Sequence, residues 1–90
     1  MSIAQRPHRT GHVVFTVVGT FGADDARELR RLLAELDPGG RVTVDFHDVR
    51  RLDDVAVSAL GQGLGGGGPQ VELVGLSDHH RRLLRYVGRG

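Results

Sequence analysis

The sequence has 90 residues, which is long enough for one domain and too short for two. It holds no cysteine, which excludes a disulfide framework, a thiolate nucleophile and any zinc site with sulfur ligands. A formal net charge of +1 is too small for a nucleic-acid-binding surface, and no run approaches the roughly 20 apolar residues of a membrane span. Residues 1–12 are polar and show no apolar signal-peptide core, so we expect a cytoplasmic protein.

Strand-like and helix-like patterns alternate along the chain. Runs rich in β-branched residues predict strands, and apolar residues three or four positions apart predict amphipathic helices. The helix patterns begin near aspartates and end near glycine or proline, which is typical of helix termini. In chain order we expect a strand at Val13–Val18, a helix at Ala23–Leu36, a strand at Arg41–Phe46, a helix at Val55–Leu64, a strand at Val71–Val74 and a helix from Ser77 or Asp78 to Val87.

The segments around these elements carry expectations of their own. Residues 1–11 form a lead, either flexible or contributing an edge strand near Gln5–His12, ahead of a single domain at residues 12–90. The first predicted strand is almost continuously apolar, which indicates burial on both faces. We expect a polar connection at His47–Asp54 and a flexible turn at Gly65–Pro69.

The order of the elements indicates the fold class. Strands that alternate with helices imply an α/β fold with a largely parallel sheet and right-handed crossovers. Three short strands make a small sheet, so the lead is expected to add one more at an edge. We therefore predict a mainly parallel sheet of about four strands with helices packed on it.

A glycine-rich run and a pair of adjacent histidines have simple structural interpretations. Gly61–Gly68 follows a helix and precedes a strand, and the chain has no lysine, so we interpret this run as a turn and not as a phosphate loop. His79 and His80 are adjacent, and on a helix their rings point about 100° apart, which disfavours a shared metal ion. We interpret these histidines as exposed polar residues.

Two other groups of residues resemble catalytic sets. Ser58 could combine with His47 and Asp45 as a triad, but it lies inside a predicted helix and lacks a nucleophile elbow. The adjacent acids Asp53 and Asp54 could perform acid–base chemistry, but acids at a helix start are more typically caps. We therefore expect no enzymatic activity, no cofactor and no metal, with nucleotide binding or catalysis as a minor alternative.

The stretch from Asp45 to Leu60 resembles the signature of the STAS domain. In that family a strand ends in Asp, a short loop follows, and an Asp-Ser-Ser/Thr-Gly-Leu motif opens a helix. Asp45 matches the strand-end position and Asp53 the motif Asp at the family's spacing, while Leu52, Val57 and Leu60 match the apolar positions around them. The resemblance extends over about Gly11–Gly88, through the flanking segments Val17–Phe21, Val71–Leu76 and Arg82–Gly88.

The resemblance implies a bacterial regulatory module that binds protein. The family covers anti-sigma factor antagonists and the cytoplasmic domains of sulfate transporters. In antagonists, a kinase-like anti-sigma factor phosphorylates the second residue after the motif Asp, and here that residue is Val55. Valine has no hydroxyl, so we expect docking without a phosphate switch at this position. Asp54 either imitates part of the charge of a phosphoserine or acts only as an N-cap.

Two protein-binding functions follow from the resemblance. The first is an antagonist-like module that docks on an anti-sigma factor or related kinase-like ATPase through the loop and start of the second helix. The alternative is an accessory subunit of a membrane transporter, contacting its ATPase subunit, or of a larger signalling assembly. Neither function requires nucleic-acid binding or insertion in a membrane. The residues expected to contact the partner are Asp53, Asp54, Val55, Ala56 and Ser58, with Thr20 and Phe21 on a nearby turn.

Overall fold

The computed structural model describes residues 2–9, 11–37, 39–63 and 70–87. Strands and helices follow the alternation that the sequence predicts, with one additional strand at the N-terminus. Each predicted element is present within a few residues of its expected bounds, apart from one strand that is much longer. The elements are β1 (Ser2–Arg9), β2 (His12–Phe21), α1 (Ala23–Ala34), β3 (Arg41–Leu52), α2 (Asp54–Gly63), β4 (Gln70–Val74) and α3 (Asp78–Val87).

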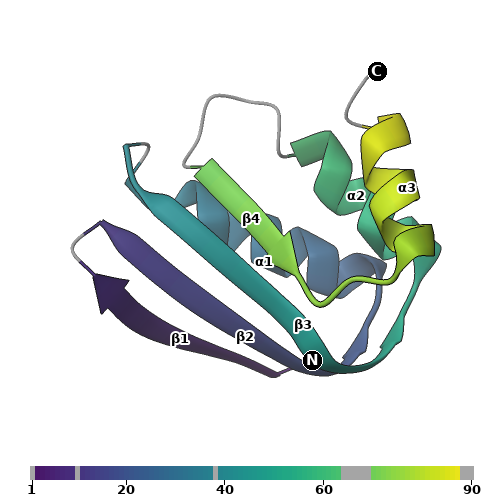
Figure 1. Cartoon of the computed structure of the whole chain (residues 1–90), viewed down its shortest axis with the longest axis horizontal. Coiled ribbons are helices and arrows are strands. Elements are labelled where there is room, and N and C mark those ends of the chain that lie inside the picture. The colour runs from purple at the N-terminus through teal and green to yellow at the C-terminus, as the bar shows by residue number, and fades with distance from the viewer. Residues whose placement is uncertain (1, 10, 38, 64–69, 88–90) are drawn as a thin grey trace.

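The four strands form one mixed sheet in the order β1-β2-β3-β4 (Figure 1). β1 runs antiparallel to β2, whereas β2, β3 and β4 run parallel to one another. The lead is therefore the edge strand that completes the sheet, which confirms the predicted fold class. This strand starts at Ser2, earlier than expected, and His12 belongs to the next strand.

The helices lie on one face of the sheet. In Figure 1, α1 crosses behind the strands, and α2 and α3 lie beside each other at one end. Residues of the three helices join the inward-facing strand residues in a single apolar cluster. Its fully or almost fully buried members are Phe15, Val17, Phe21, Ala26, Leu29, Leu33, Val42, Val44, Phe46, Ala56, Leu60 and Leu76.

This one-sided packing corrects the expectation that the first long strand is buried on both faces. Phe15 and Val17 of β2 are buried, but Val18 on the opposite face is 44% exposed. The strand is apolar on both sides because β-branched residues favour extended backbone, and not because a second layer covers it.

The second correction concerns β3, which continues through the predicted polar connection as far as Leu52. Its last residues pair with the end of β2, where Phe21 lies opposite Leu52. β4 is shorter and its pairing stops where Val74 meets Asp45. The outer half of β3 is therefore paired on one side only. Two register shifts against β2, between Asp45 and Asp48 and between Val49 and Arg51, interrupt the period-2 alternation there, so that Val49 and Leu52 are half-buried between pairs of exposed polar residues.

The helix bounds differ from expectation by one or two residues. α1 ends at Ala34, with Glu35 as its C-cap, and α2 begins at Asp54. The predicted turn at Gly65–Pro69 lies outside the described residues. Within the described parts of the chain, no helix is long and apolar enough to cross a membrane.

Candidate functional site

The start of α2 lies against the turn that follows β2. The backbone N–H of Asp53 donates to the carbonyl oxygen of Phe21 at 3.1 Å, which ties the two segments together. The carbonyl of Asp53 in turn accepts the N–H of Val57 at 3.1 Å and so starts the helix. A Cβ added at Gly22 would lie 3.5 Å from Asp53 Oδ2, so the carboxylate sits directly over this turn. The two segments expected to contact a partner are therefore neighbours.

The exposed side chains at this location form a small surface that we call the α2 start. Val55 is 66% exposed, which makes it the more exposed of two large apolar side chains found at the surface of the described residues. The side chains of Asp53 and Asp54 are 45% and 59% exposed, and Thr20 is also exposed. Arg51 Nε lies 3.5 Å from Asp53 Oδ1, so one cation pairs with this carboxylate at the surface. The α2 start therefore combines one apolar side chain with two carboxylates and one arginine, a pattern suited to contact with an apolar partner surface that carries basic groups.

Three predicted contact residues occupy different positions from those expected. Phe21 and Ala56 are both 0% exposed and belong to the core, so their side chains cannot contact a partner. Ser58 is half-buried on α2. The reason is periodicity: Ala56 faces the sheet on the first turn of α2, and Phe21 points inward at the end of β2. Phe21 and Ala56 therefore leave the predicted contact set, whereas Asp53, Asp54, Val55, Ser58 and Thr20 stay in it as predictions.

The α2 start has polar neighbours that the sequence interpretation missed. His79 Nε2 lies 3.1 and 3.0 Å from the two carboxylate oxygens of Asp54, and His80 Nε2 lies 3.3 Å from Oδ1. The same His80 nitrogen lies 3.1 Å from the carbonyl oxygen of Leu52. The two adjacent rings, expected to diverge, converge on one carboxylate because His79 reaches across the surface while His80 turns inward.

These histidines alter the ionisation of Asp54. The hydrogen bond with His79 holds the pKa of Asp54 below its ordinary value of 3.8. Desolvation opposes this shift, and smaller effects of the charges of His79 and His80 add to it. The carboxylate is therefore the form present throughout the neutral range. The only sequence signal for this cluster was a pair of histidines at the start of a helix that follows a strand.

The residues of the imagined triad are not assembled. His47 Nδ1 lies 2.6 Å from Asp45 Oδ1, and the backbone N–H of His47 donates to the same oxygen at 2.9 Å. Within the described residues, no hydrogen bond joins Ser58 to either side chain. Asp45 thus contacts both the backbone N–H and the ring of His47, where β3 extends past the end of β4.

This local bond leads to a prediction about acid stability. The N–H of His47 lowers the pKa of Asp45 from its ordinary value of 3.8, so the carboxylate stabilises the fold above that pH. The contribution is lost as the pH falls through the lowered value. We expect Asp45→Asn to lower the free energy of unfolding by at most about 1 kcal/mol near neutral pH, because the side chain is partly exposed. Near pH 2 the variant and the wild type should have the same free energy of unfolding. Urea unfolding at the two pH values checks this, and an equal loss at both would contradict it.

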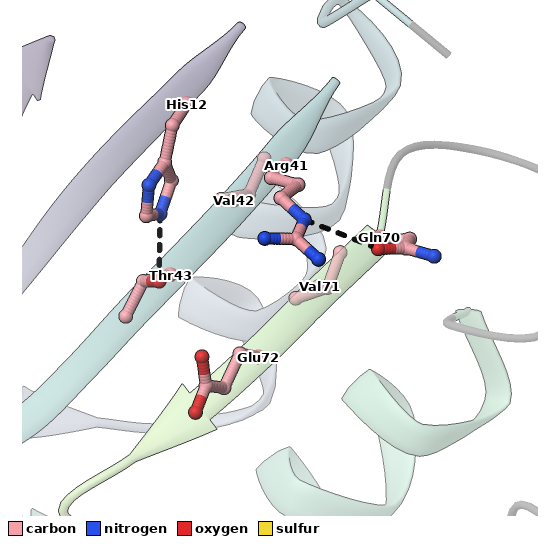
Figure 2. A pocket seen from close by; sticks show the side chains of 7 residues that line it. All are labelled: His12, Arg41, Val42, Thr43, Gln70, Val71 and Glu72. Carbon is pink, nitrogen blue, oxygen red and sulfur yellow. Dashed lines mark hydrogen bonds between the residues drawn. The ribbon is translucent and has the colours of Figure 1, made fainter. Parts of the chain in front are cut away.

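The open face of the sheet carries a broad depression across β2, β3 and β4. Its volume is about 430 Å³, and Figure 2 shows the polar side chains that line it. His12 Nε2 lies 3.0 Å from Thr43 Oγ1, and the Nε–H of Arg41 donates to Gln70 Oε1 at 3.4 Å. These two side-chain pairs bond across neighbouring strands, so we assign no ligand to this depression.

Comparison with known proteins agrees with this fold. The family model described as "Mlab, STAS domain" matches residues 5–90. No curated protein matches the chain. Among solved structures, the chain is similar to the anti-sigma factor antagonist SpoIIAA in its unphosphorylated form, with a TM-score of 0.68 and 12% identity over 94% of this chain and 83% of that one.

A second solved structure shows the same fold inside a larger protein. The crystal structure of Mglu matches with a TM-score of 0.69 and 20% identity. The match covers 83% of this chain but only 20% of Mglu, so the chain spans about a fifth of that protein. At such identities the two structures show the fold alone, whereas the family model covers nearly all of the sequence. The chain belongs to the STAS domain family, in the branch described by the Mlab model.

Proposed function

We propose that this domain is a regulatory binding module that docks on an anti-sigma factor or a related kinase-like ATPase through the α2 start. The observation that carries the proposal is the exposure of Val55, at 66%, directly after two carboxylates at the first turn of a helix. An isolated apolar side chain in this setting gives a partner an anchor, and the carboxylates around it favour a basic partner surface. The module would act in the cytoplasm.

The proposal includes docking without a phosphate switch at the family position. The exposed position that would hold the phosphoacceptor is Val55, and valine cannot accept a phosphoryl group. Asp54 next to it keeps a negative charge, but the carboxylate is already engaged by His79. Its charge is therefore partly neutralised whenever the imidazole is protonated, which makes Asp54 a weak imitation of a phosphoserine.

We expect Asp53→Lys/Asp54→Lys to abolish capture of the partner. The double change replaces two surface carboxylates by cations and reverses the charge that a basic partner surface would meet. The measurement is a pull-down from native lysate with mass spectrometric identification of the recovered protein and of the intact bait. Recovery of an anti-sigma factor kinase with an unphosphorylated wild-type bait supports the proposal.

Two further variants make this result specific. Glu28→Lys/Glu35→Lys changes the net charge equally on two exposed residues, one on α1 and one at its C-cap, and should leave capture unchanged. Val55→Lys places a cation on the exposed anchor without a change to the helix start, and it should also abolish capture. Capture that survives both the Asp53/Asp54 and the Val55 variants would rule out the α2 start as the docking surface.

A second candidate function is an accessory subunit of a membrane transporter. The absence of a hydroxyl at Val55 favours this transporter function, because a permanently docked subunit needs no phosphate switch. The same pull-down distinguishes the two functions: recovery of a transporter ATPase subunit instead of an anti-sigma factor would assign the domain to transport.

A further inference from the structure

The carboxylate of Asp54 and two imidazoles bring three possible metal ligands together at the surface. One donor atom from each of Asp54, His79 and His80 lies within 4.8 Å of the other two. Two histidines and one carboxylate form a ligand set that suits Zn²⁺ and related ions. Bonds of about 2.0–2.2 Å in a tetrahedron place neighbouring ligand atoms about 3.3 Å apart. The distances from a single oxygen, Oδ1 of Asp54, to Nε2 of His79 and of His80 are 3.1 and 3.3 Å and have about this size.

The inner histidine is already oriented by the protein. The side chain of His80 is only 16% exposed, and its Nδ1 lies 2.7 Å from Ser77 Oγ. Its Nε2 points at the oxygens of Leu52 and Asp54, which only accept hydrogen bonds, so in the metal-free protein this nitrogen carries a proton. A metal ion at Nε2 would require the other neutral tautomer: the ring proton would leave Nε2, and Nδ1 would carry one and donate it to Ser77 Oγ. Such an outer hydrogen bond fixes the tautomer and orientation of a metal-binding histidine.

We propose that Asp54, His79 and His80 bind one divalent transition-metal ion of the Zn²⁺ class, with water in the remaining position. Asp54 and His79 have side chains that are 59% and 63% exposed, so the ion enters from solvent without any opening of the fold. The imidazoles select Zn²⁺, Co²⁺, Ni²⁺ or Cu²⁺ over Mg²⁺ and Ca²⁺, which require mostly oxygen ligands. The site depends only on residues of this chain and does not rest on the proposed docking function.

The test is a titration of the full-length domain, produced without a histidine tag, with ZnCl₂ by isothermal calorimetry and with CoCl₂ by visible absorption. We expect one ion per chain, with an affinity that falls as the pH is lowered, because the imidazoles must be deprotonated to bind. Loss of an outer partner of a ligand already costs 10- to 100-fold in affinity, so we expect His79→Gln to weaken binding at least about tenfold. Asp54→Asn should weaken it similarly.

His47→Gln provides the matched control. His47 also contacts a carboxylate, that of Asp45, but among the described residues this pair has no third ligand, so its variant should bind zinc like the wild type. Thermal unfolding of metal-free His79→Gln should match the wild type, because His79 is exposed and its loss leaves the core intact. The proposal is overturned if the wild type binds none of these ions, or if His79→Gln and Asp54→Asn bind as tightly as the wild type. Because capture by the Val55→Lys variant is measured separately, failure of the metal site and failure of the docking proposal are distinguishable.

Discussion

Phe21→Ala is expected to lower the free energy of unfolding by about 3–5 kcal/mol. Phe21 is fully buried at the end of β2, and its ring meets that of Phe46 edge to face with centroids 5.3 Å apart. Truncation removes the apolar contact and leaves a cavity that the surrounding strands cannot easily close. Domains are stable by about 5–15 kcal/mol, so the loss is a large fraction of the total. Urea unfolding followed by circular dichroism measures it.

The same change should disturb the α2 start, because a backbone shift at position 21 toward the cavity would move the main-chain carbonyl that accepts the N–H of Asp53. Phe21→Leu is the matched control: it keeps most of the volume and should cost less than about 1.5 kcal/mol. If Phe21→Ala cost no more than Phe21→Leu, the ring would not be the core contact described above, and the position of α2 would depend on other residues.

Gly75→Ala is expected to destabilise the fold by about 2–4 kcal/mol. Gly75 has φ of +80°, in the left-handed region where a Cβ costs about 1–2 kcal/mol. A Cβ there would also lie 2.6 Å from the backbone nitrogen and 3.0 Å from Cα of His47. Backbone atoms cannot move aside as a flexible side chain does, and this nitrogen is already bonded to Asp45. The close approach therefore adds the cost of overpacking to that of the dihedral angle.

Gly19→Ala separates the two contributions. Gly19 has φ of +92°, but a Cβ added there meets nothing within 4 Å. Only the dihedral cost applies, so we expect a loss of about 1–2 kcal/mol. Unfolding free energies from urea titrations of the two variants provide the comparison. If Gly75→Ala and Gly19→Ala lost the same free energy of unfolding, the contact between Gly75 and β3 would not limit the packing of β4.

The elements and the fold class could be predicted from the sequence because they depend on local patterns. Ala26, Leu29 and Leu33 recur at helical spacing, and all three are buried on α1. Val42 and Val44 alternate with polar residues in β3, and both face the core. Such periodicities describe which side of an element is apolar whatever lies opposite. The absence of a hydroxyl at Val55 is likewise a property of the sequence alone.

The tertiary structure decided what lies opposite each element. An apolar run such as that of β2 fits a strand with one covered face as well as one with two, and only the position of the helices distinguishes them. Phe21 and Ala56 moved from the predicted contact surface into the core for the same reason. The cluster of Asp54, His79 and His80 joins residues about 25 positions apart, through the packing of α3 against α2. Local sequence patterns determined the elements of this protein, whereas its polar cluster depends on contacts between distant residues, which only the packing of those elements creates.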